Sequence, residues 1–402
     1  MRARKAMTPE SGRASAQPRS KATPPLRNWA IETALPFWAG AGVDAQRGGF
    51  HERLQLDGTP DRACPRRTRV QARQIYVYAH AAALGWYPEG TAVALHALEF
   101  MLAKCRAPDG APGYVHRLAA DNSVLDPLRD TYDHAFVLLA LAWLARASGD
   151  AQVRALIDEV LAFMDERLSA SDGTLLEGCL PLFDQKPPPE PRRQNPHMHA
   201  YESMLALQET IAHPLAPARA QALRNLLEAN FLDQRTGTIG EYFTDDWRRW
   251  PDARGELAEP GHHAEWSWLL RRHQRLCGVE AEPLADHLLK VARRAADPAT
   301  GFIADEVDRT GAIRKASRRC WPQTELAKAL LAAAEAGSPR AADQAADVLR
   351  GIEAHYLAGP FPGGWIDQFD ACGRRLADTV PASTFYHLFG AIAEADRVLE
   401  PI

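Results

Sequence analysis

A histidine and a carboxylate stand close together in the segment Pro260–Trp266, which reads Pro-Gly-His-His-Ala-Glu-Trp. Pro-Gly typically ends a loop, and the apolar residues that follow have helical spacing. His262 is therefore expected near a helix N-terminus, with Glu265 three residues further on and on the same face. An imidazole exchanges protons near neutral pH, and a neighbouring carboxylate orients it. The segment indicates acid–base chemistry, although a plain capping turn has the same spacing.

Polar and aromatic residues also stand where five other helical patterns begin, or where a turn precedes them. They are Arg73, Asp130, Tyr132, Asp133, Asn195, His199, Trp321, Trp365 and His387. Ordinary structural roles compete with function at several of these positions. Asn195 is also a good helix N-cap, the two aspartates suit a first helical turn, and either tryptophan suits a core. For His199, His262 and His387, the convergence of three histidines on one region favours a functional role.

Two other chemistries can be compared with histidine-mediated proton transfer. A zinc site needs several closely spaced ligands, and no HExxH or similar ligand pair occurs in the sequence. Glycoside hydrolysis needs two opposed carboxylates, and the sequence offers Glu265 with Asp130, Asp133, Glu325 or Asp367 as the second. The number of histidines favours proton transfer over both.

The elements that would position these residues form a repeat. A turn glycine followed by an apolar run recurs at Gly49, Gly113, Gly173, Gly237, Gly301 and Gly364, in steps of 64, 60, 64, 64 and 63 residues. A nearly constant period of this length indicates repeated structural units. After most of these glycines a short strand-like run and a second turn predict a small β-hairpin.

Two helical patterns lie between successive hairpins, which makes twelve helices. The expected spans are 27–40, 66–85, 89–105, 130–147, 151–168, 197–211, 215–230, 262–277, 280–296, 321–336, 339–357 and 382–398. Short loops follow every second helix, so neighbouring helices should be antiparallel. An open stack of helical pairs needs polar end caps, but the last helix has an apolar face. The sequence therefore predicts an all-α (α/α)6 barrel over residues 26–402, one domain, with the long loops on one face.

Composition narrows the classes of partner. The chain has 402 residues and a net charge of −4 without a broad basic face, which argues against nucleic acid. No apolar run has membrane-spanning length. Six cysteines without a CxxC spacing suggest free thiols and a cytoplasmic protein. Residues 1–25 are rich in Arg, Lys, Ser and Pro without an apolar core, which predicts a disordered tail and not a secretory signal.

Several motifs together resemble the N-acylglucosamine 2-epimerase family over about residues 27–398. They are Gln71-Ala72-Arg73-Gln74, Asn195-Pro196-His197-Met198-His199, the segment Pro260–Trp266, Trp321-Pro322-Gln323-Thr324-Glu325 and Ser383-Thr384-Phe385-Tyr386-His387. The resemblance implies the same barrel and metal-independent chemistry at the C1 and C2 atoms of a sugar. It also implies that His262 and His387 are the acid–base pair, with Arg73, Asn195, His199, Glu265 and Trp321 in the site. Within the family the motifs are most similar to bacterial mannose isomerases and proteins described as mannose-6-phosphate isomerase-like.

The resulting expectation is a sugar isomerase that interconverts D-mannose and D-fructose through an enediolate. Catalysis would involve His262, His387, Glu265 and Arg73, and binding would involve Tyr132, Asn195, His199, Trp321 and Trp365. We expect a monosaccharide substrate, no cofactor, no metal, and a monomer or homodimer. Two histidines serve isomerisation and epimerisation equally, so an N-acylglucosamine or other sugar 2-epimerase is the alternative. A non-catalytic helical-repeat protein that binds sugar is a third.

Overall fold

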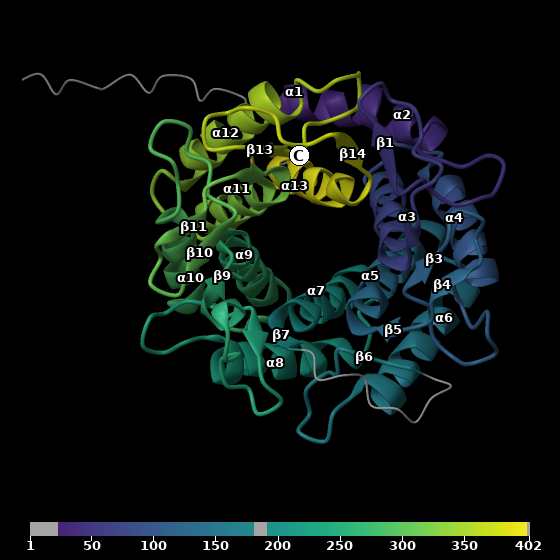
Figure 1. The fold of residues 1–402 in the computed structure, drawn as a ribbon, viewed down its shortest axis with the longest axis horizontal. Coiled ribbons are helices and arrows are strands. Elements are labelled where there is room, and N and C mark those ends of the chain that lie inside the picture. The colour runs from purple at the N-terminus through teal and green to yellow at the C-terminus, as the bar shows by residue number, and fades with distance from the viewer. Residues whose placement is uncertain (1–22, 181–190, 400–402) are drawn as a thin grey trace, which may run out of the picture.

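The computed structural model describes residues 23–180 and 191–399, and in them two concentric rings of helices surround one axis (Figure 1). The predicted disordered tail lies outside the described residues, except for residues 23–25, which belong to the first helix. The inner ring consists of α3 (Thr68–Ala83), α5 (Thr131–Ser148), α7 (Gln194–Ile211), α9 (Pro260–Cys277), α11 (Cys320–Glu335) and α13 (Ser383–Leu399). Each inner helix packs against the next, and α13 packs against α3, which closes the ring.

The outer ring is made of shorter helices, four of which contain a π-helical turn. Its members are α1 (Thr23–Asn28) with η1 (Trp29–Ala34) and α2 (Leu35–Gly40); α4 (Gly90–Lys104); α6 (Ala151–Phe163) with η2 (Met164–Leu168); α8 (Ala216–Leu226) with η3 (Leu227–Phe231); α10 (Leu284–Arg293); and α12 (Ala341–Gly351) with η5 (Ile352–Tyr356). The predicted barrel of six helix pairs is confirmed. Among the described residues, no helix combines the length and the apolar character needed to cross a membrane.

The inner helices are buried on nearly every side, as α5 shows. Its residues from Thr131 to Ala145 are all buried apart from Tyr132, because the outer ring covers one face and the inner ring fills the other. Asp130 caps α5 by accepting a hydrogen bond from the backbone N–H of Asp133 (3.0 Å). The helix ends at Gly149, whose φ of +68° suits glycine.

Short antiparallel strand pairs join the long loops into a circle on the face where the inner helices begin. Each pair links the strand before an inner helix to a strand of another repeat's loop. The pairs are β2 (Arg66–Arg67) with β3 (Arg117–Leu118), β5 (Arg129–Asp130) with β6 (Gly178–Cys179), β7 (Arg192–Arg193) with β8 (Tyr242–Phe243), β9 (Leu257–Ala258) with β10 (Glu306–Asp308), β12 (Arg318–Arg319) with β13 (Gln368–Phe369), and β14 (Thr379–Pro381) with β1 (Arg53–Gln55). These pairs hold the loops of neighbouring repeats in register.

The predicted hairpins are only partly present. Complete two-stranded hairpins form where β4 (Val124–Asp126) pairs with β3 and where β11 (Ile313–Lys315) pairs with β10. After Phe50 and after Trp365 the expected hairpin is reduced to a single bridge, Leu54 with Pro60 and Phe369 with Arg375. Their strands pair mainly with another repeat, a long-range contact that local turn signals do not contain.

The repeating glycines adopt positive φ values, which explains why glycine recurs there. Gly49 has a φ of +69°, and a Cβ atom added to it would lie 2.6 Å from the Phe100 ring. In the sixth repeat the residue with positive φ is Gly363 (+83°), one position before the predicted Gly364. The turn therefore has the same geometry in all six repeats, and only in the sixth does the glycine with positive φ stand one position earlier than predicted.

Each of five such turns is fixed to an inner helix by one side chain. The backbone N–H after the turn donates to Gln71, His134, His197, His263 or Gln323, at 2.7 to 3.1 Å. In the three histidines Nε2 is the acceptor, and Nδ1 donates to the carbonyl four residues earlier. Burial lowers the pKa of each of these histidines to about 4. They are neutral structural residues.

Candidate active site

The residue two positions after each anchoring side chain lies at one level of the inner ring. These residues are Arg73, Phe136, His199, Glu265 and Glu325, and His387 is the counterpart in α13. Four of them, together with residues of the first helical turns, line a cavity of about 180 Å³. The cavity is lined by Arg73, Tyr132, Asn195, His199, Glu259, His262, Glu265, Arg319, Trp321 and His387. Eight of the nine predicted site residues are in this set.

Trp365 is the exception, and its predicted contact with substrate is wrong in this geometry. Its side chain is fully buried and is not among the residues that line the cavity. The ring stacks on Trp38 at 4.9 Å between ring centroids and packs against Phe385 at 5.6 Å. Trp365 is a core aromatic, which is the structural alternative that the sequence left open.

His262 is held by a carboxylate and carries a proton at neutral pH. Its Nδ1 lies 3.0 Å from both carboxylate oxygens of Glu241. Gln194 donates to Glu241 (2.9 Å) and accepts from Trp266 (2.8 Å), which fixes the carboxylate. Burial alone would lower the pKa of His262, but Glu241 and Glu259 raise it to about 9. The imidazolium therefore offers its Nε2–H to the cavity.

His387 has the opposite protonation state. Its Nδ1 donates to Oε1 of Glu325 at 2.8 Å, which leaves Nε2 as the free nitrogen. Burial, together with the nearby cations of Arg73 and Lys328, lowers the pKa of His387 well below its usual value. Nε2 is consequently unprotonated at neutral pH and able to accept a proton. The two histidines thus form an acid and a base within one cavity.

Trp321 lies between the two histidines. Its ring centroid is 5.1 Å from that of His262 and 5.5 Å from that of His387. The preceding inner helix, α9, allows this position because it has no side chain at Gly261. A Cβ atom there would lie 2.6 Å from the Trp321 ring. Trp321 therefore presents an apolar face to the cavity beside both ionisable groups.

Arg73 is a buried cation without a carboxylate partner among the described residues. Its Nη2 donates to the Tyr132 hydroxyl at 2.9 Å, and its Nε has no hydrogen-bond partner. The guanidinium lies over the rings of Phe136 (4.2 Å) and Tyr386 (4.9 Å). These aromatic contacts hold the charge in place without neutralising it, so Arg73 can stabilise an anionic group in the cavity.

His199 and Glu265 form a further polar group on the wall. His199 Nδ1 bonds Glu202 at 3.0 Å and lies 3.9 Å from Oε1 of Glu265. Burial lowers the pKa of His199 to about 4, so this histidine is neutral. Burial, with Glu325 adding to it, raises the pKa of Glu265 well above its usual value. A neutral Glu265 carboxyl can donate as well as accept a hydrogen bond.

Asn195 is the second residue of α7 and not its N-cap, which is Arg193. The Asn195 side chain lines the cavity, and its Oδ1 is buried without a hydrogen-bond partner. A buried carbonyl oxygen without a donor is costly unless a bound molecule supplies one. The functional interpretation of Asn195 is therefore favoured over the capping role.

Sequence reasoning missed two residues of the cavity wall, Glu259 and Arg319. They form an ion pair at 2.9 Å, and Arg319 also lies over the Trp321 ring at 5.3 Å. Each is the N-cap residue of an inner helix, α9 or α11. The signal that could have found them is their place directly before the motifs at His262 and Trp321. Glu241 was also missed, because no local pattern joins it to His262.

Within the described part of the chain, the fold brings together three groups of residues that could hold a metal ion. They are His116, Asp130 and Asp133; His199, Glu202 and Glu265; and Glu241, Glu259 and His262. In each group the histidine is hydrogen-bonded to a carboxylate, at 2.7 to 3.0 Å. In each group two residues are three positions apart in one segment and the third comes from another segment, so the sequence alone shows no complete set of ligands. Independence from metal stays a prediction.

Comparison with known proteins gives the chain's relatives. The family model described as N-acylglucosamine 2-epimerase (GlcNAc 2-epimerase) matches residues 48–391. A mannose-6-phosphate isomerase of Rhizobium meliloti is 32% identical over 386 residues, covering 93% of this chain and 97% of that protein. A cellobiose 2-epimerase of Bacteroides fragilis is 24% identical, covering 72% of this chain and 76% of that protein.

Solved structures agree on the fold. A D-mannose isomerase crystal structure superposes with a TM-score of 0.85 at 22% identity, covering 96% of this chain and all of that one. At this identity the likeness concerns the barrel architecture alone.

Proposed function

Because the chain belongs to the N-acylglucosamine 2-epimerase family of sugar isomerases and epimerases, we propose that it interconverts D-mannose and D-fructose. The proposal rests on one observation above all. Two histidines of opposite protonation state share a cavity of about 180 Å³, and each is held by a different carboxylate. Pairs of titratable groups with separated pKa values are the usual sign of an acid and a base.

The reaction moves one proton between carbon atoms and one between oxygen atoms. In open-chain mannose, His387 Nε2 removes the C2 proton, and the electron pair forms the C1–C2 double bond of a cis-enediol(ate). His262 Nε2–H protonates O1 as the carbonyl double bond opens. The O2 proton then passes to His262, the C2=O2 bond forms, and His387 returns its proton to C1. Both histidines end as they began, and the product is fructose.

Arg73 and the helix termini support the anionic intermediate. The Arg73 guanidinium lacks a carboxylate partner, so its charge is available for O1 or O2. Six parallel inner helices begin on this face, and their N-termini add positive potential. Such preorganised charges are usually the largest contribution to lowering a barrier.

The cavity favours a small neutral sugar. About 180 Å³ suits one sugar ring better than the two rings of a disaccharide such as cellobiose. Arg319, the other arginine in the wall, is neutralised by Glu259 and Asp305, which leaves no paired cations for a phosphate. Trp321 offers its ring to the C–H face of the sugar, while Asn195 and Glu265 can bond its hydroxyls.

A 2-epimerase is the second candidate, and relatives named cellobiose 2-epimerase favour it. In that case His262 would leave O1 unprotonated and give its own Nε2 proton to the opposite face of C2, and the C1=O1 bond would re-form to give the C2 epimer. The two histidines would end in exchanged protonation states, which proton exchange with solvent would reset. The same residues would carry both outcomes.

The deciding experiment incubates the purified protein separately with mannose, glucose, N-acetylglucosamine and cellobiose and separates the products. Fructose from mannose is the expected result. A C2 epimer without ketose would select the epimerase, and no product from any sugar would mean a non-catalytic sugar-binding protein.

A further inference from the structure

A second cavity, of about 410 Å³, lies at the opposite end of the barrel, where the inner helices finish. Its walls come from α3, α5, α7, α9 and α13. The residues that matter for the argument are Tyr76, His80, Trp143, Glu209, Trp268 and Arg272. Leu84 and Arg146 line the same cavity and are exposed, so a small molecule can enter from solvent.

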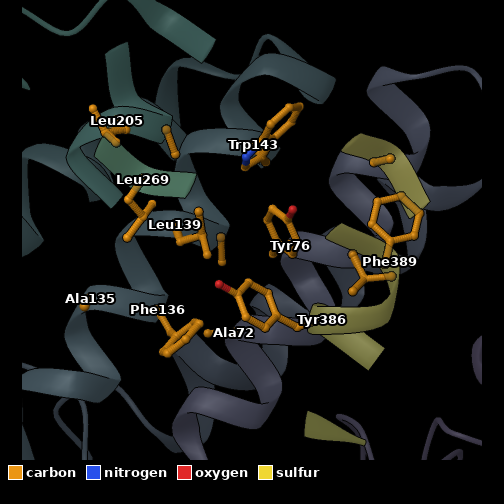
Figure 2. Close-up of a cluster of buried hydrophobic side chains, with 14 of the residues drawn as sticks. Ala72, Tyr76, Ala135, Phe136, Leu139, Trp143, Leu205, Leu269, Tyr386 and Phe389 are labelled. Atoms are coloured by element: carbon orange, nitrogen blue, oxygen red, sulfur yellow. The ribbon is translucent and has the colours of Figure 1, made fainter. Parts of the chain in front are cut away.

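A packed layer separates this cavity from the active site. Tyr386 donates to Glu202 at 2.6 Å and contacts Tyr76 edge to face at 5.3 Å between centroids. Tyr76 in turn contacts Trp143 at 6.1 Å, and Figure 2 shows Tyr76 between Tyr386 and Trp143. None of the residues that line one cavity lines the other. The proposed acid–base chemistry therefore makes no use of the second cavity.

Trp143 leaves a polar group unsatisfied there. Its side chain is only 6% exposed, yet the indole Nε1–H has no hydrogen-bond partner. A buried donor without an acceptor is destabilising, and a bound acceptor would recover that cost. His80 stacks on the Trp143 ring at 3.5 Å and bonds Tyr76 through Nδ1. Its Nε2 makes no hydrogen bond within the described part of the chain.

Three arginines and three carboxylates line this cavity, so their charges balance. Arg146 bonds the Glu209 backbone carbonyl oxygen (3.4 Å), and the other five groups are in ion pairs. Arg272 donates to Glu209 through Nε and Nη2, at 3.0 and 2.5 Å. Arg397 is bonded to both Glu335 and Glu394. His80 is neutral, because burial lowers its pKa to about 3. The oxygen atoms and N–H groups of paired ions can form hydrogen bonds with hydroxyl groups. Because their charges are already neutralised, they do not require a charged ligand.

From these contacts we propose that the cavity is a second binding site, for a small neutral polyhydroxylated molecule such as a monosaccharide or sugar alcohol. Trp143 Nε1–H donates to a ligand hydroxyl, and the part of the Trp268 ring that lines the cavity contacts the ligand's C–H groups. The Arg272–Glu209 pair and His80 bind further hydroxyls. The volume lies within the usual range for small-molecule sites, about 300–1,000 Å³.

The test follows the indole of Trp143 by NMR while mannitol, which has no carbonyl group to isomerise, is added to the full-length protein. The Trp143 indole N–H signal is identified as the one missing from the ¹H–¹⁵N spectrum of Trp143→Phe. We expect it to shift saturably with mannitol. The phenylalanine keeps an aromatic ring at this position but loses the donor together with the five-membered ring, so mannitol affinity by calorimetry should fall about three- to tenfold.

A cavity-filling variant provides the second arm. Ala83, which lines the cavity and is partly exposed, becomes tryptophan in Ala83→Trp, and mannitol binding at the Trp143 signal should disappear. Leu215→Trp, at an exposed position outside the cavity, should leave it unchanged. Circular dichroism checks that each variant is folded.

Three outcomes overturn the proposal. The first is an unmoved Trp143 signal across a panel of mannitol, sorbitol and inositol. The second is polyol binding that Trp143→Phe and Ala83→Trp leave intact, which would place the ligand elsewhere. The third is a shift with inorganic phosphate and none with polyols, which would mean an anion site. Because every readout is binding at this cavity, failure here is distinct from failure of the proposed isomerase activity.

Discussion

His262 and His387 are the same type of residue, but their surroundings give them opposite protonation states at neutral pH. Glu241 and Glu259 supply negative charge next to His262, whereas Arg73 and Lys328 supply positive charge next to His387. A third histidine, His263, is one position from His262 and serves only to hold a loop. The function of a histidine here depends on the partner of each ring nitrogen, which spacing along the chain does not specify.

The first prediction concerns the base. Replacing His387 by Asn removes Nε2 as proton acceptor and should lower kcat for mannose by at least ~10²-fold, the usual contribution of a general base. Product formation measured under saturating mannose gives the value. His96→Asn is the control, because that side chain lies on the outer helix α4, is 60% exposed and does not line the active-site cavity. A folded His387→Asn protein with near wild-type turnover would contradict the proposed mechanism.

The second prediction concerns pH. His262 acts as an acid while protonated, so activity should fall as pH rises through about 9. His387 acts as a base while neutral, and its lowered pKa places the acidic limb well below 6.5. Glu241→Gln removes the charge that raises the pKa of His262, so the alkaline limb of kcat/KM should move to lower pH. An alkaline limb that stays in place would show that His262 is not the group that titrates.

The third prediction concerns metals. The three histidine–carboxylate groups are each internally hydrogen-bonded, so we expect turnover to survive exhaustive treatment with EDTA. Activity assays before and after chelation, with the metal content measured in parallel, provide the check. Loss of activity restored by one divalent ion would point to one of these groups as its site.

At the scale of elements, Trp321 can occupy its position only because the neighbouring helix has no side chain at Gly261. α9 carries Gly261 directly before His262, and this gap lets Trp321 of α11 approach both histidines. The strands between neighbouring loops hold the first turns of these helices in register. Contacts between elements therefore position the site, and no single helix contains it.

The fourth prediction tests that gap. Gly261→Ala should displace the Trp321 ring and lower kcat/KM for mannose about 10- to 100-fold, since a misplacement of about 1 Å can have such an effect. Steady-state kinetics measures it. Gly40→Ala is the matched control, because a Cβ atom there meets nothing within 4 Å. Unchanged kinetics in Gly261→Ala would mean that Trp321 does not contribute to the site in its present position.

At the scale of the whole molecule, closure of the ring depends on contacts between the two ends of the chain. Trp38 of α2 stacks on Trp365, which packs on Phe385 of α13. Trp38 also donates from its indole nitrogen to the Gly363 carbonyl at 3.0 Å. α13 packs against α3 on its other side, which leaves no open end of the helical repeat.

The fifth prediction follows from this cluster. Trp365→Ala should lower the free energy of unfolding by about 3–5 kcal/mol, the usual range for a large buried aromatic. Urea unfolding followed by circular dichroism measures it, in the temperature range where the variant is folded. Because Trp365 does not line the cavity, KM for mannose should stay within about twofold. A raised KM with unchanged stability would return Trp365 to the substrate site.

The sequence by itself determined the barrel and most of the candidate site. The glycine period and alternating loop lengths are local signals, repeated six times, and they specify helical pairs whose N-termini share one face. Residues near those N-termini must then meet, which is why Arg73, Asn195, His262 and His387 were found. Three features depend on contacts between residues that are distant in sequence, so only the tertiary structure decided them. They are the pairing of His262 with Glu241, the placement of Trp365 in the core, and the joining of loops by strands. The protonation states of the histidines also depend on the tertiary structure. A pKa depends on burial and on charges from other helices, and the local spacing of residues specifies neither.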